Sequence, residues 1–199
     1  MAYYIKHIDH AGLQKKKYFF DANLWLKILK PPFNLSNRDQ KYLDFFEKFK
    51  NHPQHPKIAV TALVLSEVIN RYLRDVSFKK FCKKSGVADP PPPSYYKEVY
   101  RSSQQFQADY VSLCEDIKAY QNYYELIPDG LASDIKQKDI LTSPPVNLDF
   151  NDLYYYKLAL KHGFVIVTDD KDFFVEDVEV LTYNHQLVEK AKATVVIKK

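Results

Sequence analysis

Residues 152–173 read DLYYYKLALKHGFVIVTDDKDF and place a helix pattern directly before a strand pattern. One set of positions follows the i, i+3, i+4, i+7 spacing of a buried helix face, namely Leu153, Tyr156, Leu160 and Lys157, whose charged end could reach water. Gly163 stands where the end of a helix needs a residue that tolerates a positive φ. Phe164 to Val167 is a short apolar run rich in β-branched residues, which is typical of a buried parallel strand.

Acidic residues follow that strand at once, in Thr168-Asp169-Asp170. In a parallel sheet Asp170 would lie at the carboxyl edge of its strand, where open α/β sheets bind their ligands. Other strand patterns occur at 18–20, 57–61 and 178–181, with helix patterns between them and a last edge strand expected at 194–197. This alternation predicts an α/β fold with three layers, α/β/α, around a central, mainly parallel sheet of four to five strands.

The segment 85–130 interrupts the alternation. It begins with a Pro-rich break at Pro90 to Pro93 and continues as a Tyr-rich helix pattern over 95–124, with an interruption expected near Ser102-Ser103. A chain of 199 residues is long enough for one domain that carries an insertion. We therefore expect a single domain over residues 1–199, with a helical insertion without strands at 85–130.

Composition excludes several classes of protein. The net charge of +4 permits a polyanionic substrate without demanding one, and the four Gly form neither GxGxxG nor a P-loop, which argues against dinucleotide-binding proteins and ATPases. No run has the length of a transmembrane helix and the N-terminus lacks a signal-peptide layout, so a cytoplasmic location is expected. Cys82 and Cys114 lack zinc-site spacing and are expected to be buried thiols. The pairs His7/His10 and His52/His55 have a metal-like spacing but no further ligands, and surface positions are expected for them.

Four acids occupy comparable places around the expected sheet. Asp21 follows the strand at 18–20, Glu67 lies in an apolar helix after the strand at 57–61, Asp152 opens the last unit, and Asp170 ends its strand. In a parallel sheet these four can converge at one edge, and crowded carboxylates need a counter-cation to stay ionised. Mg²⁺ or Mn²⁺ prefers such oxygen ligands and can activate water against a phosphodiester.

Each acid also has a structural interpretation. Asp21 could cap the helix that starts at Ala22, and both Asp149 and Asp152 could cap the final helix. The acids after Val167 are residue types common in turns, and Glu67 could pair with Arg71 one helical turn later.

The segments Phe19-Phe20-Asp21-Ala22-Asn23, Leu65-Ser66-Glu67-Val68, Asp152 to Gly163 and Val167 to Phe173 occur in the order of a known family. Together they resemble the PIN-domain nucleases, the VapC-like ribonucleases found as toxins of bacterial toxin–antitoxin pairs. The resemblance covers roughly residues 17–81 and 150–183.

This resemblance implies a Mg²⁺- or Mn²⁺-dependent endoribonuclease that hydrolyses phosphodiester bonds of single-stranded RNA. It implies that four acids are catalytic and hold the metal, and that three residues support them. The acids are Asp21, Glu67, Asp152 and Asp170, and the supporting residues are Asn23, Thr168 and Asp172. It also suggests an antitoxin partner and a homodimer.

Two other functions stay open. A phosphatase of the haloacid dehalogenase type also begins with a strand ending in Asp, but Asn23 stands where that class needs a second Asp. A catalytically silent PIN-like scaffold could bind RNA or protein, although none of the four acids is missing. The Tyr-rich segment could stack on RNA, hold an antitoxin helix, or pack against its own domain.

Overall fold

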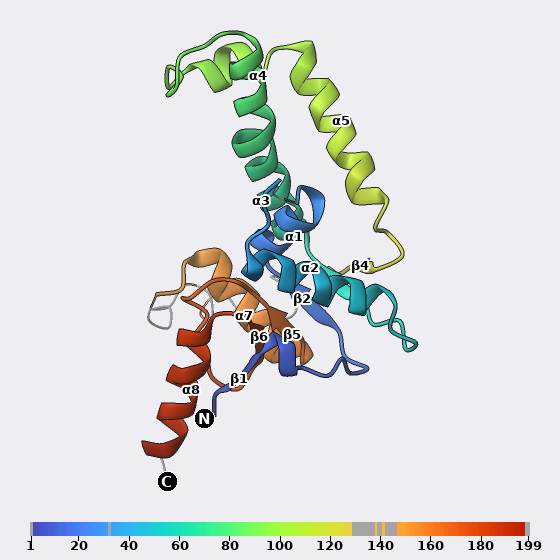
Figure 1. The fold of residues 1–199 in the computed structure, drawn as a ribbon, viewed down its shortest axis with the longest axis vertical. Helices are drawn as coiled ribbons and strands as arrows, with labels where there is room; N and C mark the ends of the chain where they lie inside the picture. Colours follow the sequence, from blue (N-terminus) through green and yellow to red (C-terminus); the bar gives the residue numbers. More distant parts are fainter. Residues whose placement is uncertain (1, 32, 129–137, 139–140, 142–146, 198–199) are drawn as a thin grey trace. The chain divides into compact units, whose positions relative to one another are not determined.

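The computed structural model describes residues 2–31, 33–128, 138, 141 and 147–197. The chain falls into two compact units (Figure 1). The first unit combines Met1–Val64 with Tyr123–Lys199, and the second is Leu65–Asn122. The prediction that the whole chain is one domain with an insertion at 85–130 stays a prediction, and residues 129 and 130 lie outside the described residues.

The first unit contains a six-stranded parallel sheet in the order β1-β6-β5-β2-β3-β4. The strands are β1 (Tyr4–His7), β2 (Tyr18–Phe20), β3 (Ile58–Val60), β4 (Tyr124–Leu126), β5 (Val165–Val167) and β6 (Glu179–Thr182). The three strands β5, β2 and β3 are buried along their whole length, as their apolar runs predict. The α/β fold with a parallel sheet flanked by helices is therefore confirmed.

The number of strands differs from the expected four to five. β4 lies inside the stretch predicted to be helical, where it pairs with β3 as a half-exposed edge strand of three residues. The edge strand predicted at 194–197 is wrong, because this segment is the last turn of helix α8 (His185–Ile197). Its β-branched residues favour a strand only weakly, and the continuing helix overrides that preference.

Among the residues that the structure describes, the helical segments of the first unit include η1 (Ile8–His10), α1 (Ala22–Leu29), α2 (Asn37–Lys50), α7 (Phe150–His162) and α8. The ends that Asp149 and Gly163 predicted for α7 are confirmed. Ser36 caps α2, Asp149 caps α7, and Gly163 ends α7 with a φ of 66°.

The buried face of α7 differs from the predicted one. The helix buries Leu153, Tyr154, Tyr155, Leu158 and Ala159, whereas Leu160 is exposed and Tyr156 and Lys157 are half-buried. Tyr155 packs its ring against Phe19 of β2, with centroids 4.6 Å apart. Because three consecutive Tyr make the helix apolar on several sides, spacing alone could not select the correct face.

The second unit is helical. From Leu65 it contains the rest of α3 (Ala62–Tyr72), the π-helical turn η2 (Leu73–Ser77), α4 (Phe78–Lys84), the π-helical turn η3 (Tyr96–Tyr100) and α5 (Gln104–Lys118). Ser103 caps α5, so the interruption predicted near Ser102-Ser103 is confirmed. One hydrophobic cluster of this unit consists of Phe78, Cys82 and Tyr100, against which Phe81, Val87, Tyr95, Tyr96 and Phe106 pack. These three tyrosines therefore pack within their own unit.

Three further predictions concern membrane-spanning helices, the two cysteines and His7. Within the described residues, no helix is long and apolar enough to cross a membrane. Cys82 is buried as expected, while Cys114 is only half-buried, and both are free thiols. The surface position predicted for His7 is wrong, because this side chain is 9% exposed at the end of β1.

Candidate functional site

Asp21 lies directly after β2, at the carboxyl edge of the sheet, and is 5% exposed. It is the N-cap of α1, because its Oδ1 accepts a hydrogen bond of 2.8 Å from the amide of Leu24. Its other oxygen, Oδ2, accepts a hydrogen bond from the hydroxyl of Thr168, and the amide of Asp169 also donates to this carboxyl. Asp21 therefore caps a helix and also presents a buried carboxyl group at this edge.

Burial raises the pKa of Asp21 to about 6. The three hydrogen-bond donors lower the pKa because they stabilise the ionised form, but the loss of hydration outweighs them. Near neutral pH the carboxyl group is thus poorly stabilised as an anion by its own surroundings, and a nearby cation would relieve this cost.

Asp152 lies in the first turn of α7, where its amide donates a 2.9 Å hydrogen bond to Oδ1 of the cap residue Asp149. The pKa of Asp152 is raised to about 7. Burial is the largest cause, and the negative charges of Asp149, Asp170 and Asp21 raise it further. Asp152 is therefore close enough to Asp21 and Asp170 for their charges to repel one another.

Thr168 connects the acids that follow β2 and β5. Its hydroxyl donates to Asp21 and accepts a 2.9 Å hydrogen bond from the amide of Asp170. Oδ1 of Asp170 in turn accepts a 2.9 Å hydrogen bond from the amide of Asp172. This chain of bonds fixes the loop after β5 in place.

Tyr42 of α2 holds Thr168 from the other side. Its buried hydroxyl donates to the carbonyl of Thr168 over 2.9 Å and accepts from the amide of Tyr183 over 2.8 Å. Burial raises the pKa of Tyr42, so its hydroxyl remains a donor across the physiological range. No local pattern predicted this role of Tyr42, because 126 residues separate it from Thr168.

Asp169 has a different environment from Asp170. Lys27 Nζ lies 3.1 Å from Asp169 Oδ2, and Arg38 donates to both the carboxylate and the carbonyl of Asp169. Lys27 also pairs with Asp39 of α2. No local pattern pointed to Lys27 or Arg38, since α1 and α2 meet the loop after β5 only in the folded chain.

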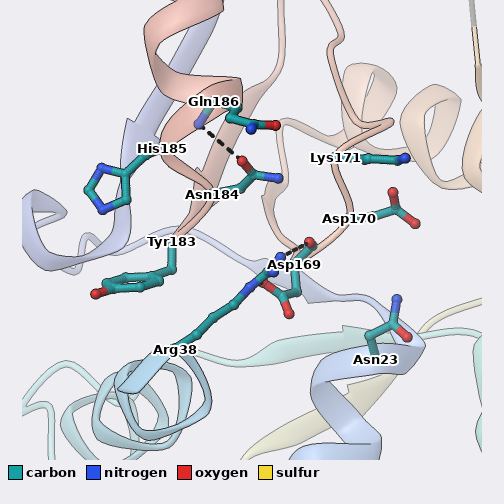
Figure 2. A pocket seen from close by; sticks show the side chains of 9 residues that line it. All are labelled: Asn23, Arg38, Asp169, Asp170, Lys171, Tyr183, Asn184, His185 and Gln186. Atoms are coloured by element: carbon teal, nitrogen blue, oxygen red, sulfur yellow. Dashed lines mark hydrogen bonds and ion pairs between the residues drawn. The ribbon is translucent and has the colours of Figure 1, made fainter. Parts of the chain in front are cut away.

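Asn23 and Asp170 line one hollow of about 580 Å³ at this edge of the sheet. In Figure 2, Asn23, Asp170 and Lys171 lie on one side of it, and Tyr183 and His185 lie on the other. Arg38, Asp169, Asn184 and Gln186 complete the lining. The hollow thus presents both carboxylate and cationic side chains to the same space.

The fourth predicted acid, Glu67, lies on α3 in the second unit. Its carboxylate is half-buried, 3.5 Å from Nη1 of Arg71, which is the salt bridge considered from the sequence. Within the first unit the fold brings together Asp21, Asp152 and Asp170, along with Thr168 and Asp172.

A divalent cation suits the chemistry of the three aspartates, which offer hard oxygen ligands whose charges repel. Among the residues that the structure describes, no group of three or more His, Cys, Asp or Glu is arranged so that it could hold an ion as it stands. Binding would therefore require the carboxylates to turn about their side-chain bonds toward one point.

Residues 18–181 match the PIN domain family. The chain belongs to this family. The matched range of the PIN domain contains Asp21, Asp152 and Asp170, together with Glu67. The resemblance inferred from the sequence is thereby confirmed.

One curated relative is similar to part of this PIN domain. Ribonuclease VapC1 of Aquifex aeolicus (strain VF5) is 38% identical over 68 residues, which are 34% of this chain and 47% of that protein. The chain thus spans about half the length of this curated relative.

Two solved structures are similar to the PIN domain. The crystal structure of PAE2754 from Pyrobaculum aerophilum is 15% identical, with a TM-score of 0.46 and coverage of 94% and 97% of the two chains. The crystal structure of VapBC2 from Rickettsia felis, bound to a DNA fragment from its promoter, is 17% identical, with a TM-score of 0.40 and coverage of 82% and 96%.

Proposed function

We propose that this PIN domain is a Mg²⁺- or Mn²⁺-dependent endoribonuclease that hydrolyses phosphodiester bonds of single-stranded RNA. The observation that carries the proposal is the placement of Asp21, Asp152 and Asp170 at the carboxyl edge of a parallel sheet. Burial raises the pKa of Asp152 there, and the charges of Asp149, Asp170 and Asp21 raise it further. β2 and β5 are neighbours, with Phe20 opposite Val167, so the residues that follow the two strands must share this edge.

The three aspartates would hold the cation, which when bound supplies charge stabilisation and a more acidic water. The residues around them have separate tasks. Thr168 holds Asp21 and the backbone of Asp170 in one arrangement, so only the side chains have to turn for a cation to bind. Asn23 and Lys171 line the hollow, where an amide and an ammonium group can orient phosphate oxygens. The backbone N–H of Asp172 donates a hydrogen bond to Oδ1 of Asp170 and so keeps the loop closed.

Glu67 is the fourth acid of the proposal, and its participation stays a prediction because it belongs to the other compact unit. The Glu67→Gln variant tests it, since a ligand role predicts that cleavage needs a higher metal concentration or is lost. A role confined to the Arg71 salt bridge predicts an unchanged dependence of cleavage on metal.

The decisive experiment incubates the protein with end-labelled single-stranded RNA and Mn²⁺, with and without EDTA. Wild type should cleave only with the metal, and Asp170→Asn should lose most of the activity while keeping its fold by circular dichroism. Asp44→Asn is the matched control, because Asp44 is an exposed aspartate of α2 whose hydrogen bond from Gln40 an Asn can keep. Cleavage in EDTA, or full activity of Asp170→Asn, would refute the proposal.

Toxin activity, an antitoxin partner and a homodimer are finer parts of the same proposal. Growth arrest on induced expression, absent for Asp170→Asn, is the expected result for a toxin. The molar mass in solution, measured by light scattering, tests the homodimer directly. A silent scaffold predicts RNA binding without cleavage at any metal concentration.

A further inference from the structure

Positive charge is concentrated in the middle of the second unit. Between residues 71 and 101 the chain has eight Lys or Arg and three Asp or Glu. The net charge of this segment, +5, exceeds the +4 of the whole chain, so the rest of the protein is slightly acidic. A basic face of this kind is the electrostatic footprint of a surface that binds nucleic acid.

Helix α4, with the sequence FKKFCKK, holds four of these charges. Lys79 and Lys83 are one helical turn apart, as are Lys80 and Lys84, and all four are exposed. Like charges at this spacing destabilise a helix. Neither Lys79 nor Lys83 forms an ion pair within the described part of the chain, so their repulsion is not offset by an acid there. An external anion would offset it.

A hollow of about 540 Å³ runs beside these lysines and lies wholly within the second unit. Phe78, Cys82 and Val87 form an apolar floor, and Phe78 and Cys82 are 8% and 7% exposed. The rim carries Lys79, Lys83 and Arg74, together with Asp89 and with Asp75, which pairs with Arg74 at 3.1 Å. An apolar floor next to the two exposed lysines matches the two parts of a nucleotide, an unstacked base and its phosphate.

We infer that α4 and this hollow form a second RNA-binding site, separate from the carboxylates of the first unit, which takes the backbone of single-stranded RNA on Lys79 and Lys83 and one base on the apolar floor. The identity of the ligand as RNA rests on the proposed function. Duplex RNA fits poorly, because its bases are stacked and cannot enter the hollow.

A protein partner fits this face less well. An amphipathic helix docks through apolar anchors repeated at i, i+3, i+4 and i+7, which need a long apolar groove. The large exposed apolar side chains of the second unit are Val99 on η3 and Tyr110 and Val111 on α5. None of these three belongs to α4, whose outer face is lysine.

The test measures binding of a fluorescein-labelled single-stranded RNA by anisotropy in EDTA, where the proposed nuclease is inactive. The variant Lys79→Gln/Lys83→Gln removes two charges at nearly constant side-chain length. At about 0.1 M salt each phosphate contact with a single strand contributes roughly fivefold through counterion release, so the double variant should bind about 25-fold more weakly. The slope of log K against log salt should also fall by about 1.4.

The matched control is Lys118→Gln/Lys192→Gln, which removes the same charge from two exposed lysines on α5 and α8, each paired with a Glu. It should bind RNA within about twofold of wild type, because these two lysines are outside the proposed site and act only through the screened field of the protein. Equal losses in the two double variants, or an equal loss for duplex RNA, would overturn the inference. Unfolding curves of both variants confirm that the fold is kept.

The two proposals fail separately. If Lys79→Gln/Lys83→Gln binds RNA as wild type does while wild type cleaves RNA with Mn²⁺, the α4 site is wrong and the nuclease stands. If wild type never cleaves but loses affinity through these two lysines, the nuclease is wrong and the α4 site stands.

Discussion

Replacing Asp152 by Asn should make the protein more stable above neutral pH in the absence of divalent metal. The pKa of Asp152 is raised to about 7 by burial and by its acidic neighbours, against an ordinary value of 3.8. A raised carboxyl pKa means that the folded state favours the protonated form. The stability that wild type has at low pH is therefore lost as pH rises from about 4 to 7 and stays lost above that. Asn cannot ionise and avoids this loss.

The size of the effect follows from the pKa difference. At 1.36 kcal/mol for each pH unit, the change from 3.8 to about 7 corresponds to an upper limit of about 4 kcal/mol. Because Asp152 is only half-buried, solvent screening reduces this to about 1–2 kcal/mol. Losing a negative charge in the first turn of α7 costs about 0.3–1 kcal/mol. The net gain should be about 1 kcal/mol, or about 2–4 °C in Tm for a chain of this size.

Thermal unfolding followed by circular dichroism checks this at about pH 8 and about pH 4.5, in EDTA and then with Mg²⁺. The gain of Asp152→Asn should appear at the higher pH and shrink at the lower one. Mg²⁺ should stabilise wild type more than the variant if the aspartates bind it. Asp44→Asn should stay within about 0.5 kcal/mol of wild type throughout. An Asp152→Asn protein that is no more stable than wild type at the higher pH in EDTA would contradict the electrostatic argument.

Substitutions at three other positions test single hydrogen bonds and one backbone conformation. Thr168→Val should lower the free energy of unfolding by about 1–3 kcal/mol in urea titrations and reduce RNA cleavage, because Asp21 and the amide of Asp170 lose a partner; Thr168→Ser should restore both. Tyr42→Phe should lower the free energy of unfolding by about 1 kcal/mol, and equal stability would argue against its bridge between Thr168 and Tyr183. Gly163→Ala should cost about 1–2 kcal/mol, with Gly163→Asn costing less. The cause is the φ of 66° alone, since an added Cβ meets nothing within 4 Å.

Local signals in the sequence predicted much of the fold because their physical causes are local. The apolar runs of β2, β3 and β5 form buried strands, and Asp149 and Gly163 begin and end α7 through their own side-chain and backbone chemistry. The α7 face and β4 were predicted wrongly because both depend on which neighbour covers them. Tyr154 and Tyr155 are buried and Tyr156 is not, although the three side chains are identical.

In the candidate site, too, features with local causes were predicted and features that depend on the folded chain were not. The order of the acids along the chain predicted which carboxyl groups follow β2 and β5, but it could not predict Tyr42, Lys27 or Arg38. These residues reach the loop after β5 from helices more than 120 residues earlier in the sequence. The burial of His7 was missed for a similar reason, since its ring packs against His185 of α8, with centroids 4.5 Å apart.

The distribution of cations around the loop after β5 gives the strongest electrostatic argument about the site. Asp169 and Asp170 are consecutive, yet Lys27 and Arg38 both pair with Asp169. Within the described residues Asp170, Asp152 and Asp21 form no ion pair with Lys or Arg, although their charges repel one another. Lys27 and Arg38 lie next to the loop, but in the loop they compensate only the charge of Asp169. The charges of Asp21, Asp152 and Asp170 can therefore be neutralised by a cation from solution or by protonation. A proton and a divalent ion should therefore compete for the same carboxyl groups, and cleavage should require more Mn²⁺ as the pH falls below the raised pKa of Asp152, about 7.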